Sequence, residues 1–306
     1  MNFNTVSKPS IGELSIIAFD NCRQLGKKVD ELLVSARCLN EDIIGNRKYS
    51  FLLPIENTRF ENGEGKITLE NSVRGKDIYI LTDVGNYSCT YKIYGMQNHM
   101  SPDEHFQDLK RVLCAIGGYA RRVSVIMPLL YSGRQHKRIK RESLDCALAL
   151  QELERLGVKN IITFDAHDPR VENAVPMIGF TSLQPTYEML SALFETERNL
   201  FLDKSKLILI SPDVEAMDKA VYYSSTLGTD IGLFYRRRDY SKIVGGKNPV
   251  IQYDYMGGNV AGKDVLIVDD MISSGESMLY IIEDLKKRKA KDIYIAVTYA
   301  LFTEGI

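Results

Sequence analysis

The sequence predicts an α/β protein with two tandem domains, each built on a mainly parallel sheet. Short apolar segments of strand length alternate with longer segments in which apolar residues recur at three- and four-residue steps, as on amphipathic helices. This alternation is typical of parallel sheets whose strands are buried between helices. The chain of 306 residues is long enough for two ordinary domains, and 44% of its residues are hydrophobic.

The first half of the chain contains strands that are each followed by a helix. Strands are expected over 14–19, 78–82 and 123–130. Asp20 is expected to cap the first helix. The segment Ser-Pro-Asp-Glu at 101–104 opens the second helix, because serine before proline and acidic residues is typical of a helix N-terminus. Ser143 opens the third helix, which Gly157 ends.

The second half repeats the pattern. Strands are expected over 160–164, 207–210, 232–235, 265–268 and 293–299, with helix-like segments between them. A boundary near 157–160 divides the chain into an N-terminal domain, 1–158, and a C-terminal domain, 159–306. Because the sequence ends directly after a predicted strand, at "YALFTEGI", we expect a further segment to follow in the full protein.

Composition excludes several classes of protein. The formal net charge of -1 argues against a general nucleic-acid binder, which needs a large positive excess to neutralise phosphates. The apolar run at 124–130 is far shorter than the roughly 20 residues of a membrane helix, so we expect a cytoplasmic protein with no membrane partner. Five cysteines without Cys-x-x-Cys spacing predict neither a zinc site nor a disulfide framework.

The segment "VLIVDDMISSGESM" at 265–278 carries the clearest sign of chemistry. A predicted strand ends at Asp269 and Asp270, at the edge of a parallel sheet where ligands bind. The turn 273–277 then leads into a helix, so its backbone N–H groups and hydroxyls form an anion site, while the carboxylates can accept hydrogen bonds from vicinal hydroxyls. A phosphorylated sugar has both groups. A strand end followed by a serine-capped helix is an equally good interpretation of this segment alone.

Basic and metal-binding residue types follow other predicted strands. "LLYSGRQHKRIKRES" places six basic groups between Arg134 and Arg141, which is either a polyphosphate site or a solvated face. "FDAHD" and "LISPDVEAM" place His167 and Asp213 at strand ends, where they suit magnesium, although a lone histidine is more often structural. In "FYRRRDY", the residues 236 and 238 share a face if the segment is extended. "RFENGEGKI" indicates a turn at Asn62-Gly63.

Eight motifs of the chain carry a resemblance to a known family. In order they read "RFENGE", "SVRGKDIYI", "YSGRQHKRIKRES", "ITFDAHD", "ISPD", "YRRRDY", "VDDMISSGES" and "ALFTEGI". Together they resemble the motifs of the ribose-phosphate pyrophosphokinases, also called phosphoribosyl pyrophosphate synthetases. The match runs from about Leu14 to the last residue.

The resemblance implies two phosphoribosyltransferase-like domains and a specific reaction. The substrates would be ATP and ribose 5-phosphate, with Mg²⁺ as the essential ion. The β,γ-diphosphate would pass to the anomeric hydroxyl, giving AMP and 5-phosphoribosyl 1-diphosphate. Inorganic phosphate is a candidate activator. A homo-oligomer built from dimers is expected, because the ATP site would be shared between subunits, and a hexamer is one candidate assembly.

The resemblance also implies roles for individual residues. The adenine of an ATP bound to a neighbouring subunit would contact the turn of Phe60, Asn62, Gly63 and Glu64. The same nucleotide would be held by Arg134, Gln135 and His136. Magnesium would be bound by His167 and Asp213. Catalysis would depend on Arg236 and Arg238, on a mobile loop that closes over the triphosphate. Ribose 5-phosphate would be bound by Arg238, Asp269, Asp270, Ser273, Ser274, Gly275, Glu276 and Ser277.

Several segments depart from the family pattern. Arg236 replaces the usual lysine, His136 replaces a common aspartate, and Glu215-Ala216 replace two glycines. The phosphate loop contains Glu276, whose charge about 5 Å from a phosphate would cost roughly 3 kcal/mol at a dielectric of ~20, so this side chain is expected to face away. The stretch 86–104 diverges most.

These departures keep two other functions open. One is a family member without catalysis, which binds nucleotide or sugar phosphate and regulates a partner enzyme; the replaced lysine favours it. The other is a phosphoribosyltransferase that consumes the diphosphate. It would share the acidic loop but would not explain "RFENGE" or "SGRQHK".

Overall fold

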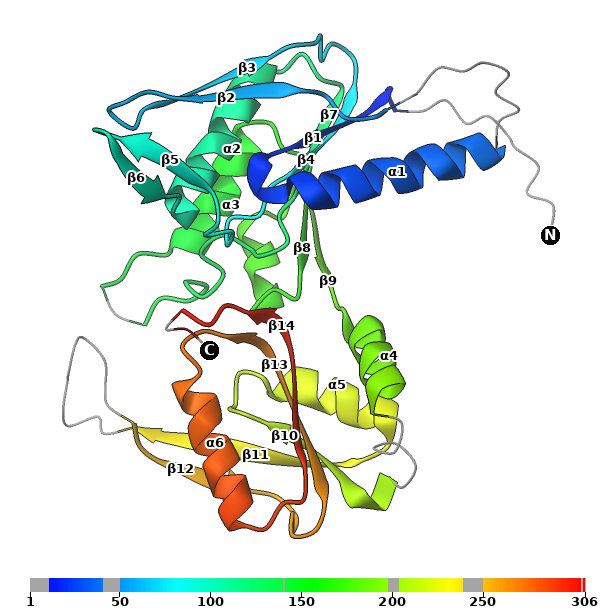
Figure 1. Ribbon diagram of the computed structural model, residues 1–306, viewed down its shortest axis with the longest axis vertical. Coiled ribbons are helices and arrows are strands. Elements are labelled where there is room, and N and C mark those ends of the chain that lie inside the picture. The colour runs from blue at the N-terminus through cyan, green and yellow to red at the C-terminus, as the bar shows by residue number, and fades with distance from the viewer. Residues whose placement is uncertain are drawn as a thin grey trace. The chain divides into compact units, whose positions relative to one another are not determined.

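The computed structural model describes residues 11–40, 50–139, 141–197, 204–238, 250–303 and 305. The chain divides into two compact units, an N-terminal unit, Met1–Leu183, and a C-terminal unit, Gln184–Ile306 (Figure 1). Within the described residues, each unit contains one five-stranded sheet that is mainly or wholly parallel, as predicted. A helix long and apolar enough to cross a bilayer is absent from these ranges.

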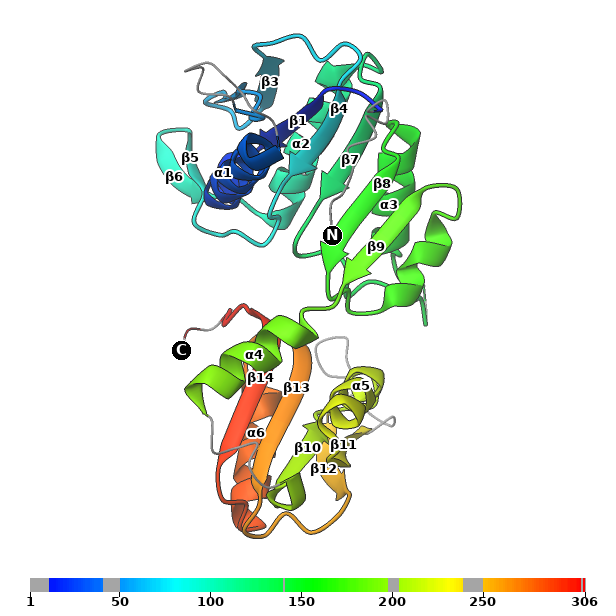
Figure 2. The same cartoon turned by 90° about the vertical axis from the view of Figure 1, so that its right-hand side faces the viewer.

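The N-terminal unit is built on a parallel sheet covered by helices on both faces. Its strand order is β1 (Leu14–Ala18), β4 (Asp77–Leu81), β7 (Arg122–Ile126), β8 (Asn160–Phe164) and β9 (Gly179–Leu183). One face is covered by α1 (Arg23–Asn40), and the other by α2 (Pro102–Ile116) and α3 (Asp145–Arg155) (Figure 2). Asp20 lies in a short 3₁₀ helix, Asp20–Cys22, that precedes α1, and its carboxylate pairs with Arg23.

Successive side chains along each strand point to opposite faces of the sheet, so the N-terminal unit has an apolar core on each face. Ile17 and Ile80 are fully buried on the face of α2 and α3, whereas Ile16 and Leu81 are buried toward α1. Each such side chain contributes about 1.5–3 kcal/mol on full burial. The predicted start of α2 is confirmed, because the Ser101 hydroxyl and the Glu104 carboxylate form a reciprocal capping box.

Among the described residues of this unit, two hairpins lie outside the sheet. The first pairs β2 (Ile55–Arg59) with β3 (Gly65–Leu69) around the turn predicted at Asn62-Gly63. The second pairs β5 (Thr90–Ile93) with β6 (Met96–His99) and falls in the divergent stretch 86–104. The sequence did not predict this second hairpin.

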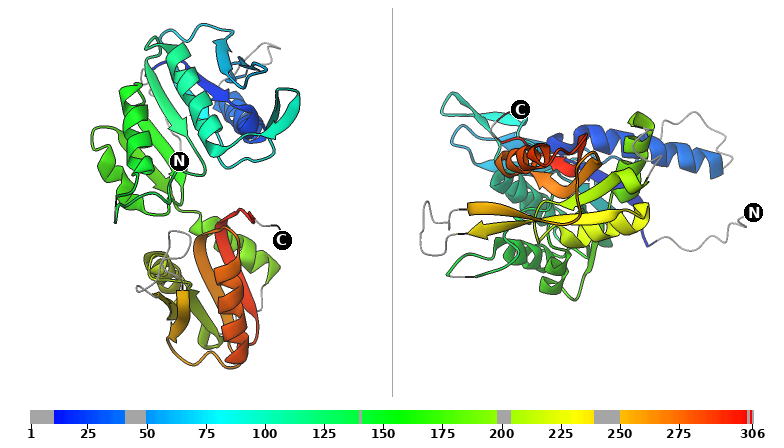
Figure 3. Two further views of the ribbon diagram at one scale, coloured as in Figure 1. Left: turned by 90° about the vertical axis from the view of Figure 1, so that its left-hand side faces the viewer. Right: turned by 90° about the horizontal axis from the view of Figure 1, so that it is seen from below.

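The C-terminal unit has a second sheet of mixed direction. Its strand order is β12 (Val250–Met256), β11 (Asp230–Arg238), β10 (Leu207–Ser211), β13 (Asp264–Ile272) and β14 (Ile293–Ala300). Only the β11–β12 pair of this described sheet is antiparallel. One face is covered by α4 (Thr186–Thr196) and α5 (Met217–Leu227), and the opposite face by α6 (Glu276–Lys287), drawn in orange (Figure 3, left).

The division between the units lies after β9 and not at the expected 158/159 boundary. Gly157 does end the segment that contains α3, as predicted. However, β8 pairs with β7 and β9 pairs with β8, so both strands complete the N-terminal sheet. The sequence signals of a helix end and a new strand are the same within a domain as between domains, which explains the early boundary.

Candidate functional site

The acidic pair, Asp269 and Asp270, lies inside β13 and not after it. The sequence predicted that this strand ends at residue 268, but its pairing with β14 continues to Ile272, opposite Ala300. Pairing with β10 on the other side stops at Ile267, opposite Ile210. The acidic pair is therefore held by β14 on one side, while the neighbouring strand has already ended on the other.

This position is also the point where the chain reverses its order in the sheet. From β10 the chain continues to β11 and β12 on one side, and then returns to place β13 on the other side. In open α/β sheets, ligands bind beyond the carboxyl ends of strands at such a switch point. Asp213 follows the end of β10, so carboxylates from both sides of the switch point gather at one edge.

Burial and neighbouring negative charges shift the pKa of Asp269 in this group of acids. Burial raises the pKa of Asp269 to about 8, and the nearby negative charges of Asp270 and Asp213 add to the rise. Asp269 Oδ1 also accepts a hydrogen bond of 2.8 Å from the Asp270 backbone N–H, which acts in the opposite direction. A bound cation, or hydroxyl groups that donate hydrogen bonds to these carboxylates, would favour the charged form and lower this pKa.

We expect Asp269→Asn to stabilise the protein at high pH and to have little effect at pH 5. In the unfolded chain this carboxyl has a pKa near 3.9, so the folded state binds its proton more tightly. The stability that comes from this proton is present at low pH and is lost as the pH rises through about 8. The melting temperature of the variant should exceed that of the wild type by about 3 °C at pH 9. An equal difference at both pH values would contradict this account.

Asp213 is fully engaged by neighbouring donors. Its Oδ1 atom accepts hydrogen bonds from the backbone N–H groups of Glu215 at 2.9 Å and Ala216 at 3.0 Å. Its Oδ2 atom pairs with the guanidinium of Arg236. This ion pair joins the first residues after β10 to β11, the adjacent strand.

The arginine segment corrects one prediction. Arg236 and Arg237 lie on β11, paired with Tyr253 and Gln252 of β12, and not on a loop. The register shifts between Arg237 and Arg238. The side chain of Arg238 lies outside the described residues, so its sharing a face with Arg236 stays a prediction.

The predicted turn 273–277 joins β13 to α6 and includes the first two residues of that helix, Glu276 and Ser277. It leaves the helix N-terminus open to a ligand. Gly275 is the N-cap residue with φ of 90°, and it has no side-chain oxygen to cap the first N–H groups of α6. Ser277 Oγ accepts a 2.9 Å hydrogen bond from the Tyr253 hydroxyl, and Ser273 O accepts one of 3.0 Å from Thr303 N. Glu276 begins α6 and is exposed. Helix N–H groups in such a turn bind anions.

A histidine and aspartate cluster follows β7 and β8 of the N-terminal unit. The His136 side chain is buried, and its Nε2 atom lies 3.5 Å from Asp168 Oδ2. The His136 ring contacts the His167 ring edge-on, with centroids 5.3 Å apart. Hydrogen bonds from Arg170 lower the pKa of Asp168 to about 2, so it is a carboxylate at neutral pH. Arg134 and Gln135 are exposed beside this cluster, and Lys140 lies outside the described residues.

The tip of the first hairpin, the 60–64 turn, presents the side chains of Phe60, Glu61, Asn62 and Glu64 to solvent. Phe60 is 47% exposed, and its backbone N–H donates to Glu64 O at 2.8 Å. Asn62 Oδ1 accepts a 3.1 Å hydrogen bond from Glu64 N, and Asn62 Nδ2 donates to Glu64 Oε2 at 3.0 Å. Gly63 has φ of 91°, which a side chain would disfavour.

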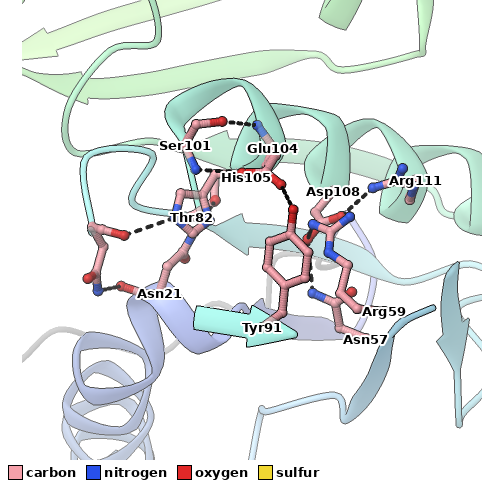
Figure 4. Close-up of polar contacts among 11 residues, drawn as sticks. Asn21, Asn57, Arg59, Thr82, Tyr91, Ser101, Glu104, His105, Asp108 and Arg111 are labelled. Atoms are coloured by element: carbon pink, nitrogen blue, oxygen red, sulfur yellow. Dashed lines mark hydrogen bonds and ion pairs between the residues drawn. The ribbon is translucent and has the colours of Figure 1, made fainter. Parts of the chain in front are cut away.

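Asp108 of α2 holds this hairpin in place. Its side chain is 2% exposed and pairs with Arg59 at 2.7 Å and with Arg111 at 2.6 Å. Asn57 Nδ2 donates to the same carboxylate at 3.0 Å (Figure 4). The 60–64 turn directly follows Arg59, so α2 sets the position of the turn.

We expect Asp108→Asn to lower the free energy of unfolding by about 2 kcal/mol, because it leaves two guanidinium groups without their shared carboxylate. Glu152→Gln is the matched control. It removes the acid from the ion pair of Lys110, also on α2, but that acid is 44% exposed, so a change below about 0.5 kcal/mol is expected. Urea unfolding of both variants measures the difference, and equal losses would contradict the role of Asp108.

The structure gathers the predicted residues in separate groups. The C-terminal unit brings together Asp213, Arg236, the acidic pair and the turn 273–277. The N-terminal unit brings His136 to His167, together with Asp168, whose role was not predicted. Asp108 was also missed, because nothing in a helical sequence shows that an acid is paired with a distant hairpin.

The side chains at these sites suit a magnesium ion that is bound mainly by water and substrate phosphates. Among the described residues, no group of three or more histidine, cysteine or acidic side chains forms a metal cage. Magnesium often takes only one or two carboxylates and completes its shell with water and substrate phosphates. Asp213 offers such a carboxylate if Arg236 moves away from its Oδ2 atom.

Comparisons with known proteins agree with this architecture. Residues 14–157 match the model of the N-terminal domain of ribose phosphate pyrophosphokinase, and residues 184–301 match the model of the phosphoribosyl transferase domain. The chain is 26% identical over 249 residues to a ribose-phosphate pyrophosphokinase of Oceanobacillus iheyensis, covering 80% of this chain and 69% of that protein. It is 25% identical over 298 residues to that of Ureaplasma parvum, covering 96% and 77%.

A solved structure shows the same fold. The phosphoribosylpyrophosphate synthetase of Mycobacterium smegmatis superposes with a TM-score of 0.69 at 20% identity, covering 94% of this chain and 82% of that one. The predicted arrangement of two phosphoribosyltransferase-like domains is therefore confirmed.

Proposed function

Because the chain belongs to the ribose-phosphate pyrophosphokinase family, we propose that it is an active diphosphokinase. It transfers the β,γ-diphosphate of ATP to the anomeric hydroxyl of ribose 5-phosphate, and the products are AMP and 5-phosphoribosyl 1-diphosphate. The observation that carries this proposal is the switch-point edge of the C-terminal unit. There the acidic pair, an open helix N-terminus and an arginine occur together.

The two parts of this edge match the two ends of the sugar substrate. Asp269 and Asp270 accept hydrogen bonds from the vicinal ribose hydroxyls. The N–H groups at the start of α6 and the hydroxyls of the turn 273–277 bind the 5-phosphate, as helix N-termini bind other phosphates. The Glu276 side chain is exposed, so its carboxylate can point to solvent while its backbone N–H contributes to binding the 5-phosphate.

Transfer requires alignment and charge neutralisation more than a strong base. The anomeric oxygen attacks the β-phosphorus of ATP and loses its proton, while the bond from that phosphorus to the α,β-bridging oxygen breaks and AMP leaves. Arg236 stabilises the charge that develops on the transferred group, after it leaves Asp213. Arg238 is proposed to act with it. Bound magnesium supplies positive charge to the phosphate oxygens.

The remaining assignments follow the family residue by residue. We assign magnesium binding to His167 and Asp213, and nucleotide binding to Arg134, Gln135 and His136. The turn of Phe60, Asn62, Gly63 and Glu64 would contact the adenine of an ATP bound to a neighbouring subunit. A cytoplasmic homo-oligomer, built from dimers and activated by inorganic phosphate, is part of the proposal.

The test is AMP formation from ATP, with and without ribose 5-phosphate, in the presence of magnesium and inorganic phosphate. The sugar product is identified by ³¹P NMR. AMP that appears in step with 5-phosphoribosyl 1-diphosphate is the expected result. Folded protein that binds both substrates without forming AMP would contradict the proposal.

One observation favours a second candidate function. Arg236 replaces the family's lysine and is already paired with Asp213, so it could act as a fixed structural ion pair. The chain would then bind nucleotide or sugar phosphate and regulate a partner enzyme. Substrate binding without AMP formation distinguishes this candidate from the first.

A further inference from the structure

The turn of the β5–β6 hairpin has an unusual residue at its tip. Ile93 pairs with Met96, so the turn consists of Tyr94 and Gly95 alone. Both have positive φ, 47° and 79°, as in hairpin turns that favour Asn-Gly. Tyrosine is disfavoured in this left-handed conformation, and burial does not compensate for it, because Tyr94 is 76% exposed. A strained, exposed aromatic residue at a turn indicates a role outside the fold.

The tip of this hairpin is joined to the 60–64 turn. The Tyr94 backbone N–H donates a 2.9 Å hydrogen bond to Glu61 O. A Cβ atom on Gly63 would lie 2.9 Å from Ile93 Cδ1, so the Ile93 side chain already packs against this glycine. Phe60 and Tyr94 are thus exposed aromatic residues on two turns that are bonded to each other.

The strands of the two hairpins are joined as well. The guanidinium of Arg59, directly before the 60–64 turn, lies 5.2 Å from the centre of the Tyr91 ring on β5. The Tyr91 hydroxyl donates to Glu104 of α2, the helix that also holds Arg59 through Asp108 (Figure 4). The two tips are therefore fixed to the same helix.

We propose that the β5–β6 hairpin is part of the nucleotide-binding surface and that Tyr94 contacts the base of a purine nucleoside triphosphate beside Phe60. The inference rests on the proposed function, which assigns the 60–64 turn to the adenine. Aromatic side chains can stack on any nucleic-acid base. Each such contact raises the affinity for the nucleotide roughly fivefold or more. A second aromatic contact favours the larger purine over a pyrimidine.

The decisive variant is Tyr94→Asn, because Asn-Gly suits this turn while the ring is lost. Dissociation constants for ATP and UTP are measured by equilibrium dialysis, with the melting temperature and the mass of the assembly recorded in parallel. Affinity for ATP should fall about fivefold to tenfold and affinity for UTP by less. The melting temperature should stay the same or rise. A purely structural role for Tyr94 would instead lower stability and leave the preference for ATP unchanged.

Two control variants test whether the aromatic ring of Tyr94 itself contributes to nucleotide binding. Tyr94→Phe keeps it and should bind ATP within about twofold of the wild type. Tyr187→Ala removes a tyrosine of similar exposure, 78%, from α4 of the C-terminal unit and should have no effect on nucleotide binding.

Phe60→Ala separates this inference from the proposed function. If Phe60→Ala weakens ATP binding and Tyr94→Asn does not, the role of Tyr94 is overturned while the 60–64 turn keeps its assignment. If Tyr94→Asn changes the mass of the assembly but not the affinity for ATP, Tyr94 contacts a second copy of the chain and the inference is wrong. If the wild type binds no ATP, or if neither variant matters, both assignments fail.

Discussion

Arg236→Ala is expected to lower kcat about 1,000-fold while the dissociation constant of ATP changes less than about threefold. The reason is that charge on the transferred diphosphate develops mainly during the reaction, so an arginine that stabilises it acts on the transition state and not on ground-state binding. In the ligand-free protein, Arg236 neutralises Asp213 instead. Arg236→Ala therefore removes the ion pair with Asp213 as well as the contact with the transferred group. It also leaves the Asp213 carboxylate without this arginine, beside the acidic pair.

Neighbouring substitutions test this assignment. Arg237→Ala removes the adjacent arginine, which alternation along β11 directs to the opposite face, and kcat should stay within about twofold. Arg236→Lys restores the residue usual in the family and should retain at least about one tenth of the activity. Steady-state rates of AMP formation at saturating substrates give kcat, and equilibrium dialysis gives the ATP dissociation constant. Unaltered turnover in Arg236→Ala would remove this residue from the mechanism.

Periodicity predicted the parallel strands well because these strands are buried on both faces. Ile208 and Ile210 face α6, whereas Leu207 and Leu209 face α4 and α5, so β10 appears in the sequence as a continuous apolar run. The sequence also predicted that the motifs after these strands meet at one edge, because the carboxyl ends of parallel strands lie together. Asp213 and the acidic pair were located in this way.

Strand ends could not be predicted by the same reasoning. The strand was predicted to end at Val268 because two acidic residues follow. In the structure, β13 continues to Ile272 through its pairing with β14. Similarly, Arg236 lies on β11 because β12 returns antiparallel beside it. A backbone partner stabilises a polar segment as a strand whatever its side chains are, and that partner is distant in the sequence.

The β5–β6 hairpin shows a different limit. Its turn, Tyr94-Gly95, does not have the Asn-Gly or Asp-Gly pair by which such turns are recognised. Its attachments include the hydrogen bond to Glu61 and the stacking of Arg59 on Tyr91, which join separate parts of the sequence. The sequence therefore indicated only that the stretch 86–104 is unusual.

Asp270→Ala is expected to raise the KM for ribose 5-phosphate about 100-fold and the KM for ATP less than about threefold. Hydrogen bonds from hydroxyls to a carboxylate are each worth about 1.5–3 kcal/mol, so the loss of one buried acceptor accounts for a change of this size. Asp270 is 6% exposed and its own backbone N–H is bonded to Asp269, so the carboxylates are held close together. Asp264→Asn, at the other end of β13, is the control and should leave both KM values unchanged.

The substrate itself offers a sharper test than the KM values. If Asp270 binds the vicinal hydroxyls, the wild type should prefer ribose 5-phosphate to 2-deoxyribose 5-phosphate, because the deoxy sugar leaves a buried acceptor without its donor. Asp270→Ala has no such acceptor, so its kcat/KM values for the two sugars should converge. The 5-phosphate is common to both sugars, so binding at the turn 273–277 contributes equally to each measurement. An unchanged preference in Asp270→Ala, or equal rises in KM for ATP and sugar, would show that Asp270 does not bind the ribose.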